Sequence, residues 1–131
     1  MIFVDSNVII YAVGRKHQLQ HEARDFFLKA ADKGANLVTS AEVLQELIHV
    51  YLPVNRVETM EAAFELVIGN IQKVLPVSEE SVLIAKSLSY DNPGLEARDL
   101  IHAAICKIHN IKEIKTFDRK LASFFKSAKR R

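Results

Sequence analysis

Ile2-Phe3-Val4-Asp5-Ser6-Asn7, near the start of the chain, is the stretch on which the predicted fold rests. Three apolar residues, two of them β-branched, are typical of a short buried strand. Asp5 falls where that strand ends, and Ser6 and Asn7 are residue types that often begin a helix. Taken alone, Asp5 is better explained as a helix cap than as a functional acid. Asp5 becomes a candidate functional acid if other acids lie at the same edge of the sheet, because open α/β sheets bind ligands at the carboxyl ends of their strands.

Short apolar segments alternate with amphipathic ones along the rest of the chain. Further strands are predicted at 35–39, 73–77 and 113–117, and helices at 8–13, 21–33, 40–51, 56–70, 78–90, 95–109 and from 118 onward. Such alternation predicts a mostly parallel sheet of four or five short strands with helices on both faces, a three-layer α/β/α architecture. Pro76 indicates that the segment 73–77 lies at an edge of the sheet or ends there.

Composition is that of an ordinary soluble domain. The 131 residues are enough for one domain (1–131) and too few for two. With 49% hydrophobic and 26% charged residues the chain is not expected to be disordered, and no apolar run is long enough to cross a membrane. The first apolar stretch is too short for a signal peptide, and Cys106 has no partner for an internal disulfide, so a cytoplasmic location is predicted.

Charge alone does not demand a nucleic-acid partner, because the net charge is only +2. Basic residues nevertheless concentrate toward the C-terminus, where the tail 126–131 is Lys-Ser-Ala-Lys-Arg-Arg. A basic tail is more often a solvated terminus than a binding arm. The function of a binding arm becomes more plausible for this tail if an acidic, metal-binding site lies close to it.

A second acid is expected from the helix that follows the strand at 35–39. Thr39-Ser40-Ala41-Glu42 has the pattern of a capping box, with Thr39 as the N-cap and Glu42 three residues later. Glu46 lies at the border of the helix's apolar arc, so its carboxylate leans toward buried surface without a capping role. Glu46 is therefore the better ligand candidate, and Glu42 remains an alternative.

Asp99 and Asp118 are the remaining candidates. Asp99 lies in the first turns of the helix 95–109, where interaction with the helix N-terminus is the simpler explanation. Asp118 directly follows the strand 113–117 and precedes a helix, the same arrangement as at Asp5. If these ends converge, four carboxylates share one cleft.

Four clustered carboxylates favour a hard divalent cation. Without one, their mutual repulsion raises their pKa values. Oxygen ligands suit Mg²⁺ or Mn²⁺, and such ions activate water for hydrolysis of phosphodiester bonds. Basic residues near the site would hold a nucleic-acid backbone. A zinc site would need the group His102, Cys106 and His109, which is a weak set on one helix.

Four segments together resemble the acidic motifs of the PIN domain, in the order of that family and over nearly the whole chain. These are Ile2-Phe3-Val4-Asp5-Ser6-Asn7, then Thr39-Ser40 with Glu46-Leu47, then Ala97-Arg98-Asp99-Leu100-Ile101-His102-Ala103-Ala104, and Thr116-Phe117-Asp118. Among PIN-like proteins, a single domain of this size most resembles the VapC toxins of VapBC toxin–antitoxin pairs.

The resemblance implies a Mg²⁺- or Mn²⁺-dependent endoribonuclease with one or two ions. Asp5, Glu46, Asp99 and Asp118 would be the catalytic and metal-binding acids. Ser6, Asn7 and Thr116 would orient these ligands or the scissile phosphate, so that Ser6 or Asn7 rather than Asp5 caps the first helix. Candidates for RNA contact are Arg15, Lys16, Lys115 and Arg119. The family also implies an RNA substrate, a VapB-like antitoxin and a homodimer.

Three other classes of protein are weighed against the nuclease. A PIN-like module that binds RNA or protein without cutting has no reason to keep four acids together. A phosphatase of the haloacid-dehalogenase type needs a second Asp two residues after the first, where this chain has Asn7. A receiver domain needs a phospho-accepting Asp at the end of a middle strand, and Leu37-Val38-Thr39-Ser40 offers none. The nuclease remains the preferred prediction.

Overall fold

Four short parallel strands lie at the centre of the computed structural model, which describes the backbone of residues 1–130 and the side chains of residues 1–128. The strands are β1 (Ile2–Val4), β2 (Leu37–Ser40), β3 (Lys73–Leu75) and β4 (Glu113–Lys115). Their order in the sheet is β3-β2-β1-β4, and each neighbouring pair is parallel. β3, the strand followed by Pro76, lies at an edge, in agreement with the prediction.

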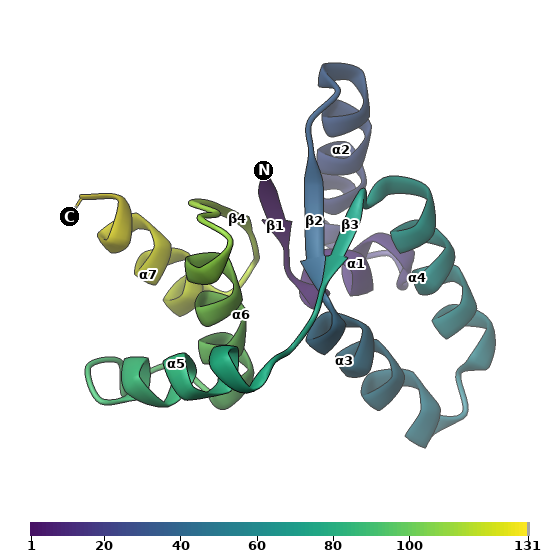
Figure 1. Ribbon diagram of the computed structural model, residues 1–131. Helices are drawn as coiled ribbons and strands as arrows, with labels where there is room; N and C mark the ends of the chain where they lie inside the picture. The colour runs from purple at the N-terminus through teal and green to yellow at the C-terminus, as the bar shows by residue number, and fades with distance from the viewer. Residues whose placement is uncertain (131) are drawn as a thin grey trace.

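Seven α-helices and one short 3₁₀ helix are described. They are α1 (Ser6–Val13), α2 (Gln18–Lys33), α3 (Ala41–Tyr51), η1 (Leu52–Val54), α4 (Val57–Asn70), α5 (Glu79–Ser89), α6 (Ala97–Ile108) and α7 (Arg119–Arg130). Helices α1, α2 and α4 lie on one side of the sheet and α5, α6 and α7 on the other, while α3 extends from the carboxyl end of β2 (Figure 1). The predicted three-layer α/β/α class is confirmed.

The predicted C-terminal tail is a helix over most of its length. Residues 126–130 continue α7, and Arg131 lies outside the described residues. Within residues 1–130 no helix has the length and apolar character needed to cross a membrane.

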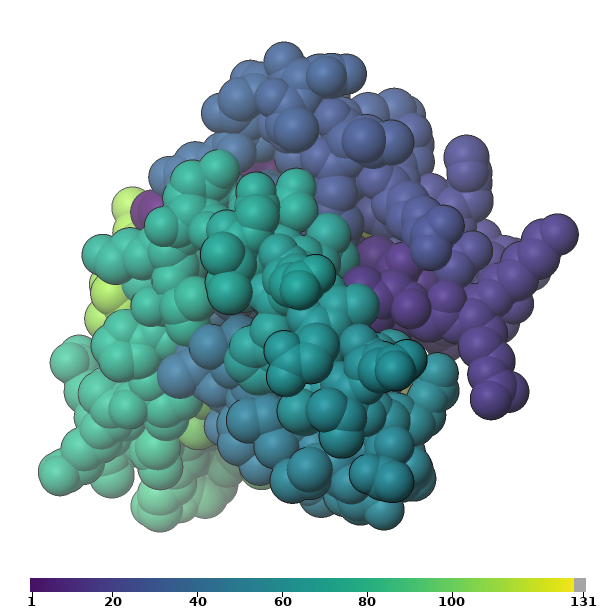
Figure 2. All heavy atoms as spheres, turned by 90° about the vertical axis from the view of Figure 1, so that its right-hand side faces the viewer, coloured from purple at the N-terminus to yellow at the C-terminus, as the bar shows by residue number. Residues whose placement is uncertain are grey.

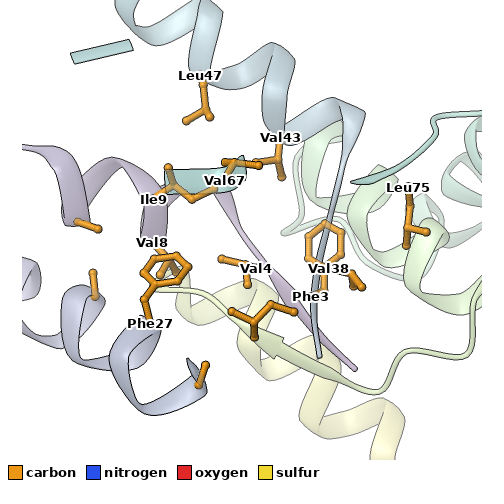
Figure 3. Close-up of a cluster of buried hydrophobic side chains, with 14 of the residues drawn as sticks. Phe3, Val4, Val8, Ile9, Phe27, Val38, Val43, Leu47, Val67 and Leu75 are labelled. Carbon is orange, nitrogen blue, oxygen red and sulfur yellow. The ribbon is translucent and has the colours of Figure 1, made fainter. Parts of the chain in front are cut away.

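The main core lies on both faces of the sheet, where buried side chains of α1, α2, α3 and α4 and of α6 and α7 pack against the strands. Parallel strands covered on both faces are apolar throughout, and Phe3, Val4 and Val38 are almost fully buried. Figure 3 shows side chains from the strands meeting those of the helices, among them Ile9 and Leu47. Because both faces of β1 are packed, the position of its carboxyl end, where Asp5 follows, is fixed by the core.

The predicted cap of α3 was wrong by one residue. Ser40 is the N-cap, and its hydroxyl accepts a hydrogen bond from the Val43 amide at 3.2 Å. The Thr39 side chain is fully buried and instead donates to the carbonyl of Val4 at 2.7 Å. Thr39 therefore ties β2 to the residue before Asp5, and Glu42 has no capping-box partner.

Thr39→Val tests this tie. Valine keeps the shape of threonine but cannot donate, so the buried Val4 carbonyl loses a partner. The free energy of unfolding should fall by about 1–3 kcal/mol, the usual cost of a buried group left unsatisfied. Urea denaturation measures it, with Thr59→Val at a partly exposed site as the control. Equal changes in the free energy of unfolding for Thr39→Val and Thr59→Val would show that the Thr39 hydrogen bond does not stabilise the fold.

Candidate functional site

One cleft collects all four predicted acids. It has a volume of about 540 Å³ and lies at the carboxyl end of the sheet. Its lining includes Asp5, Glu46, Asp99 and Asp118. Each acid comes from a different part of the chain, so only the folded topology brings them together.

Asp5 is held by three neighbouring residues. Its Oδ1 accepts a hydrogen bond from the Ser6 amide at 2.7 Å, and its Oδ2 accepts one from the Thr116 hydroxyl at 2.7 Å. The Asn7 side-chain amide also donates to Oδ2, at 3.3 Å. Asp5 is thus the N-cap of α1, and the expectation that Ser6 or Asn7 takes that role was wrong. The backbone turns into helix immediately after the strand, which leaves Ser6 already inside the first turn.

Asn7 and Thr116 join the ends of β1 and β4. The Asn7 side-chain amide donates to the Thr116 hydroxyl oxygen at 3.2 Å, and its carbonyl oxygen accepts from the Phe117 amide at 3.1 Å. The Thr116 hydroxyl oxygen also accepts from the Asp118 amide at 3.0 Å. These bonds fix the distance between the two acids that follow the strands, Asp5 and Asp118.

Glu46 is buried and hydrogen-bonded through both carboxylate oxygens. Oε2 accepts from the Ser6 hydroxyl at 2.6 Å, and Oε1 lies 2.9 Å from Nε2 of His102. Glu42, one turn earlier on α3, does not line the cleft. The helical geometry that placed Glu46 at the border of the apolar arc explains the difference, because that border faces the site.

His102 is a site residue that sequence reasoning missed. Its side chain is 1% exposed, and Nε2 lies 2.9 Å from Glu46 and 3.6 Å from Asp5. The prediction gave it no role in the acidic site and considered it as a ligand only in a weak zinc set with Cys106 and His109. A usable signal was its position three residues after Asp99 on one helix, which puts both on the same face.

The His102 imidazole serves as a hydrogen-bond donor to the acids. Burial disfavours its charged form, but the bond to Glu46 and the negative charges of Asp5, Glu46 and Asp99 outweigh burial and raise its pKa. Nδ1 has no hydrogen-bond partner among the described side chains. Since Nε2 is the nitrogen facing the carboxylates, it carries the proton that Glu46 accepts.

Asp99 and Asp118 combine helix capping with a place in the cleft. Asp99 is the third residue of α6, and its Oδ2 accepts from the Glu96 amide at 3.3 Å. Asp118 precedes α7, and its Oδ1 accepts from the amides of Lys120 and Leu121 at 2.9 and 3.1 Å. Both acids are partly exposed.

The carboxylates in the cleft affect one another's pKa values. Burial raises the pKa of Asp5, with a further contribution from the charge of Glu46. Burial also raises the pKa of Asp99, and the charges of Asp118 and Asp5 add to it. Burial acts on Glu46 in the same direction, but bonds from His102 and Ser6 outweigh it and lower its pKa. The cleft therefore concentrates negative charge that a cation would relieve.

The donor set fits a hard divalent cation. A carboxylate oxygen of Asp5 and one of Glu46 lie within 4.8 Å of each other, beside the His102 imidazole, which acts there as a hydrogen-bond donor rather than as a ligand. Asp99 and Asp118 add carboxylate oxygens from the same cleft, and oxygen-rich sites favour Mg²⁺ or Mn²⁺. The alternative zinc set is not assembled in this way, because His102 faces the acids and burial raises the pKa of the Cys106 thiol to about 12.

The predicted RNA-contact residues lie in different surroundings. Arg119 lines the cleft, whereas Arg15 and Lys16 are exposed on the loop between α1 and α2. Lys115 already forms an ion pair with Glu22 at 3.0 Å. Arg98, the residue before Asp99, also lines the cleft.

A family model described as the PIN domain matches residues 2–126, and the chain belongs to this family. Among its relatives are Ribonuclease VapC23 of Mycobacterium tuberculosis, 46% identical over 97% of this chain and all of the relative, and Ribonuclease VapC13 of the same species, 38% identical over 95% of each. The predicted resemblance to VapC proteins and the predicted enzyme class, a nuclease, are confirmed by these matches.

Solved structures share the fold. The crystal structure of Mycobacterium tuberculosis VapC20, described as a toxin that cleaves the sarcin–ricin loop, matches with a TM-score of 0.79 at 17% identity over 95% of each chain. VapBC2 of Rickettsia felis, solved with a DNA fragment from its promoter, matches with a TM-score of 0.64 at 16% identity over 84% of this chain and 83% of that one.

His102→Ala tests the role of the buried imidazole. Removing the donor to Glu46 should lower the free energy of unfolding, measured with chelator present, by about 1.5–3 kcal/mol, the net value of a hydrogen bond to a charged group. His102→Gln keeps a side-chain N–H and should recover part of the loss. His49→Ala, at an exposed site on α3, is the control. Identical urea midpoints for all variants would contradict the assignment.

Proposed function

We propose that this protein is a Mg²⁺- or Mn²⁺-dependent endoribonuclease that hydrolyses phosphodiester bonds of RNA. The observation that carries the proposal is the cleft in which four carboxylates from separate motifs meet. The ribonuclease relatives support RNA as the substrate. In this proposal Asp5, Glu46, Asp99 and Asp118 hold the metal.

The metal, when bound, supplies a nucleophilic water at neutral pH and neutralises charge on the scissile phosphate. The chain's own residues prepare the site for it. Thr116 and Asn7 hold Asp5 in place, and Ser6 with His102 does the same for Glu46. Such fixed ligands do not need to reorganise during the reaction, which is a main source of catalytic power.

Basic residues at the cleft are placed to hold the RNA backbone. Arg98, Arg119 and Lys120 line the same cavity as the acids. Their charges offset the repulsion between acidic site and phosphate, and guanidinium groups can bind phosphate oxygens in pairs.

Asp5→Asn tests the catalytic proposal. Asparagine caps a helix about as well as aspartate but binds a cation far less well, so the fold should persist. Cleavage of RNA with Mn²⁺ should fall on the order of 100-fold or more, as when one strong electrostatic contact is lost from an active site. Glu42→Gln, an acid on α3 outside the cleft, is the matched control and should cut like the parent. A fully active Asp5→Asn would refute the assignment.

Metal binding is tested independently of cleavage by thermal unfolding. A ligand that binds only the folded state, at 100 times its Kd, should stabilise the parent by about 2.7 kcal/mol. The shift with Mn²⁺ should disappear in Asp5→Asn and Asp99→Asn and persist in Glu42→Gln. Absence of any shift in the parent would favour the alternative, a PIN-like module that binds RNA or protein without cutting.

The same proposal includes a biological role as the toxin of a toxin–antitoxin pair in the cytoplasm, with a VapB-like antitoxin as its partner. It also includes a homodimer. Exposed apolar side chains gather from the end of α3 through η1 to α4, and α4 occupies the centre of the face that Figure 2 shows. They include Leu52, Val54 and Val57, a density that favours a protein contact there.

A further inference from the structure

A second and larger cavity adjoins the acidic cleft. It has a volume of about 820 Å³ and lies between α6, α7 and the connection from α5 to α6. Gly94, Arg119 and Lys120 line both cavities. These three residues therefore lie at the border between the two spaces, and a Cβ added at Gly94 would touch the Lys120 side chain at 3.8 Å. We call this cavity the α6–α7 groove.

The groove combines an apolar floor with a basic rim. Leu95, Cys106 and Phe124 contribute to its lining, and Phe124 is partly exposed, with its ring 5.8 Å from that of Phe125. The charged residues of the lining are Lys107, Lys112, Arg119, Lys120 and a single acid, Asp91. Within the side chains that the structure describes, none of these four cations pairs with a carboxylate.

This chemistry fits a single-stranded nucleic acid. Phosphates need cations along the rim, and bases gain about 1–3 kcal/mol each by stacking on aromatic side chains. Two copies of this basic groove would repel one another, which disfavours a second copy of the chain as the occupant. A substrate polymer bound at the acids must also extend beyond the cleft, and the groove borders the cleft at Gly94.

We propose that the α6–α7 groove holds the single-stranded RNA segment next to the scissile phosphate. Lys107 and Lys112 bind its backbone, and Phe124 offers a surface for a base. This inference rests on the proposed ribonuclease function but concerns binding, so it can be tested without cleavage.

The test uses a fluorescent 12-nucleotide RNA of mixed sequence and the full chain with chelator present. The double variant Lys107→Gln/Lys112→Gln should raise Kd about fivefold for each phosphate contact at 0.1 M salt, and the slope of log K against log salt should fall by about 0.7 per contact. Lys33→Gln/Lys73→Gln, at exposed positions on α2 and β3, removes the same charge and should leave both unchanged.

A steric variant separates the groove from general charge effects. Ser123 is exposed and lines the groove, so Ser123→Trp should narrow it, raise Kd and leave the salt slope nearly intact. In cleavage assays with Mn²⁺ the groove variants should raise KM for the long RNA while kcat stays close to that of the parent. Urea midpoints equal to the parent's establish that the variants fold.

The outcomes distinguish this inference from the proposed function. If Lys107→Gln/Lys112→Gln and the control Lys33→Gln/Lys73→Gln have equal Kd values and equal salt slopes, the proposal that the groove binds RNA is refuted, even if the parent cuts RNA. If the groove variants weaken RNA binding but the parent cuts no RNA, the proposal of RNA binding in the groove stands and the proposed ribonuclease function is refuted. Variants that leave RNA binding unchanged but alter the oligomeric state in size-exclusion chromatography would assign the groove to a protein and overturn the proposal.

Discussion

The hydrogen bond of 2.7 Å from the Thr116 hydroxyl to Asp5 is the contact on which the site depends most. It joins residues 111 positions apart, and it forms only when β1 and β4 pair in their observed register. Asn7 strengthens the same junction from the first turn of α1. Since the packed core fixes both strands, the spacing of the acids at their ends is a property of the whole fold.

The layers follow from local pattern, and so does the placement of three acids at the carboxyl end of the sheet, whereas Asp99 was selected through the family resemblance. Asp5 and Asp118 each come directly after a predicted strand, and the helical angle of Glu46 placed it toward buried surface. Caps were harder to predict. Thr39 has a good capping side chain, but a carbonyl on another strand uses its hydroxyl, and that contact depends on tertiary structure. His102 was missed for the same reason, since its partner Glu46 is 56 residues away.

The site is electrostatically costly in the absence of a cation. Burial and neighbouring charges raise the pKa values of Asp5 and Asp99, which means that folding brings carboxylates into an environment that disfavours their charged form. Hydrogen bonds to Asp5 and Glu46 offset part of this cost. His102 is a buried hydrogen-bond donor to Glu46 in this arrangement.

Asp118 meets two demands with one side chain, and this limits which residues can replace it. Its Oδ1 caps α7 while the residue lines the acidic cleft. Asparagine and serine also cap helices well but carry no negative charge, whereas glutamate carries the charge and is not among the preferred caps. Aspartate alone satisfies both requirements. Under the proposed function, replacing Asp118 therefore costs either the helix cap or the charge in the cleft, although the residue is neither deeply buried nor part of the core.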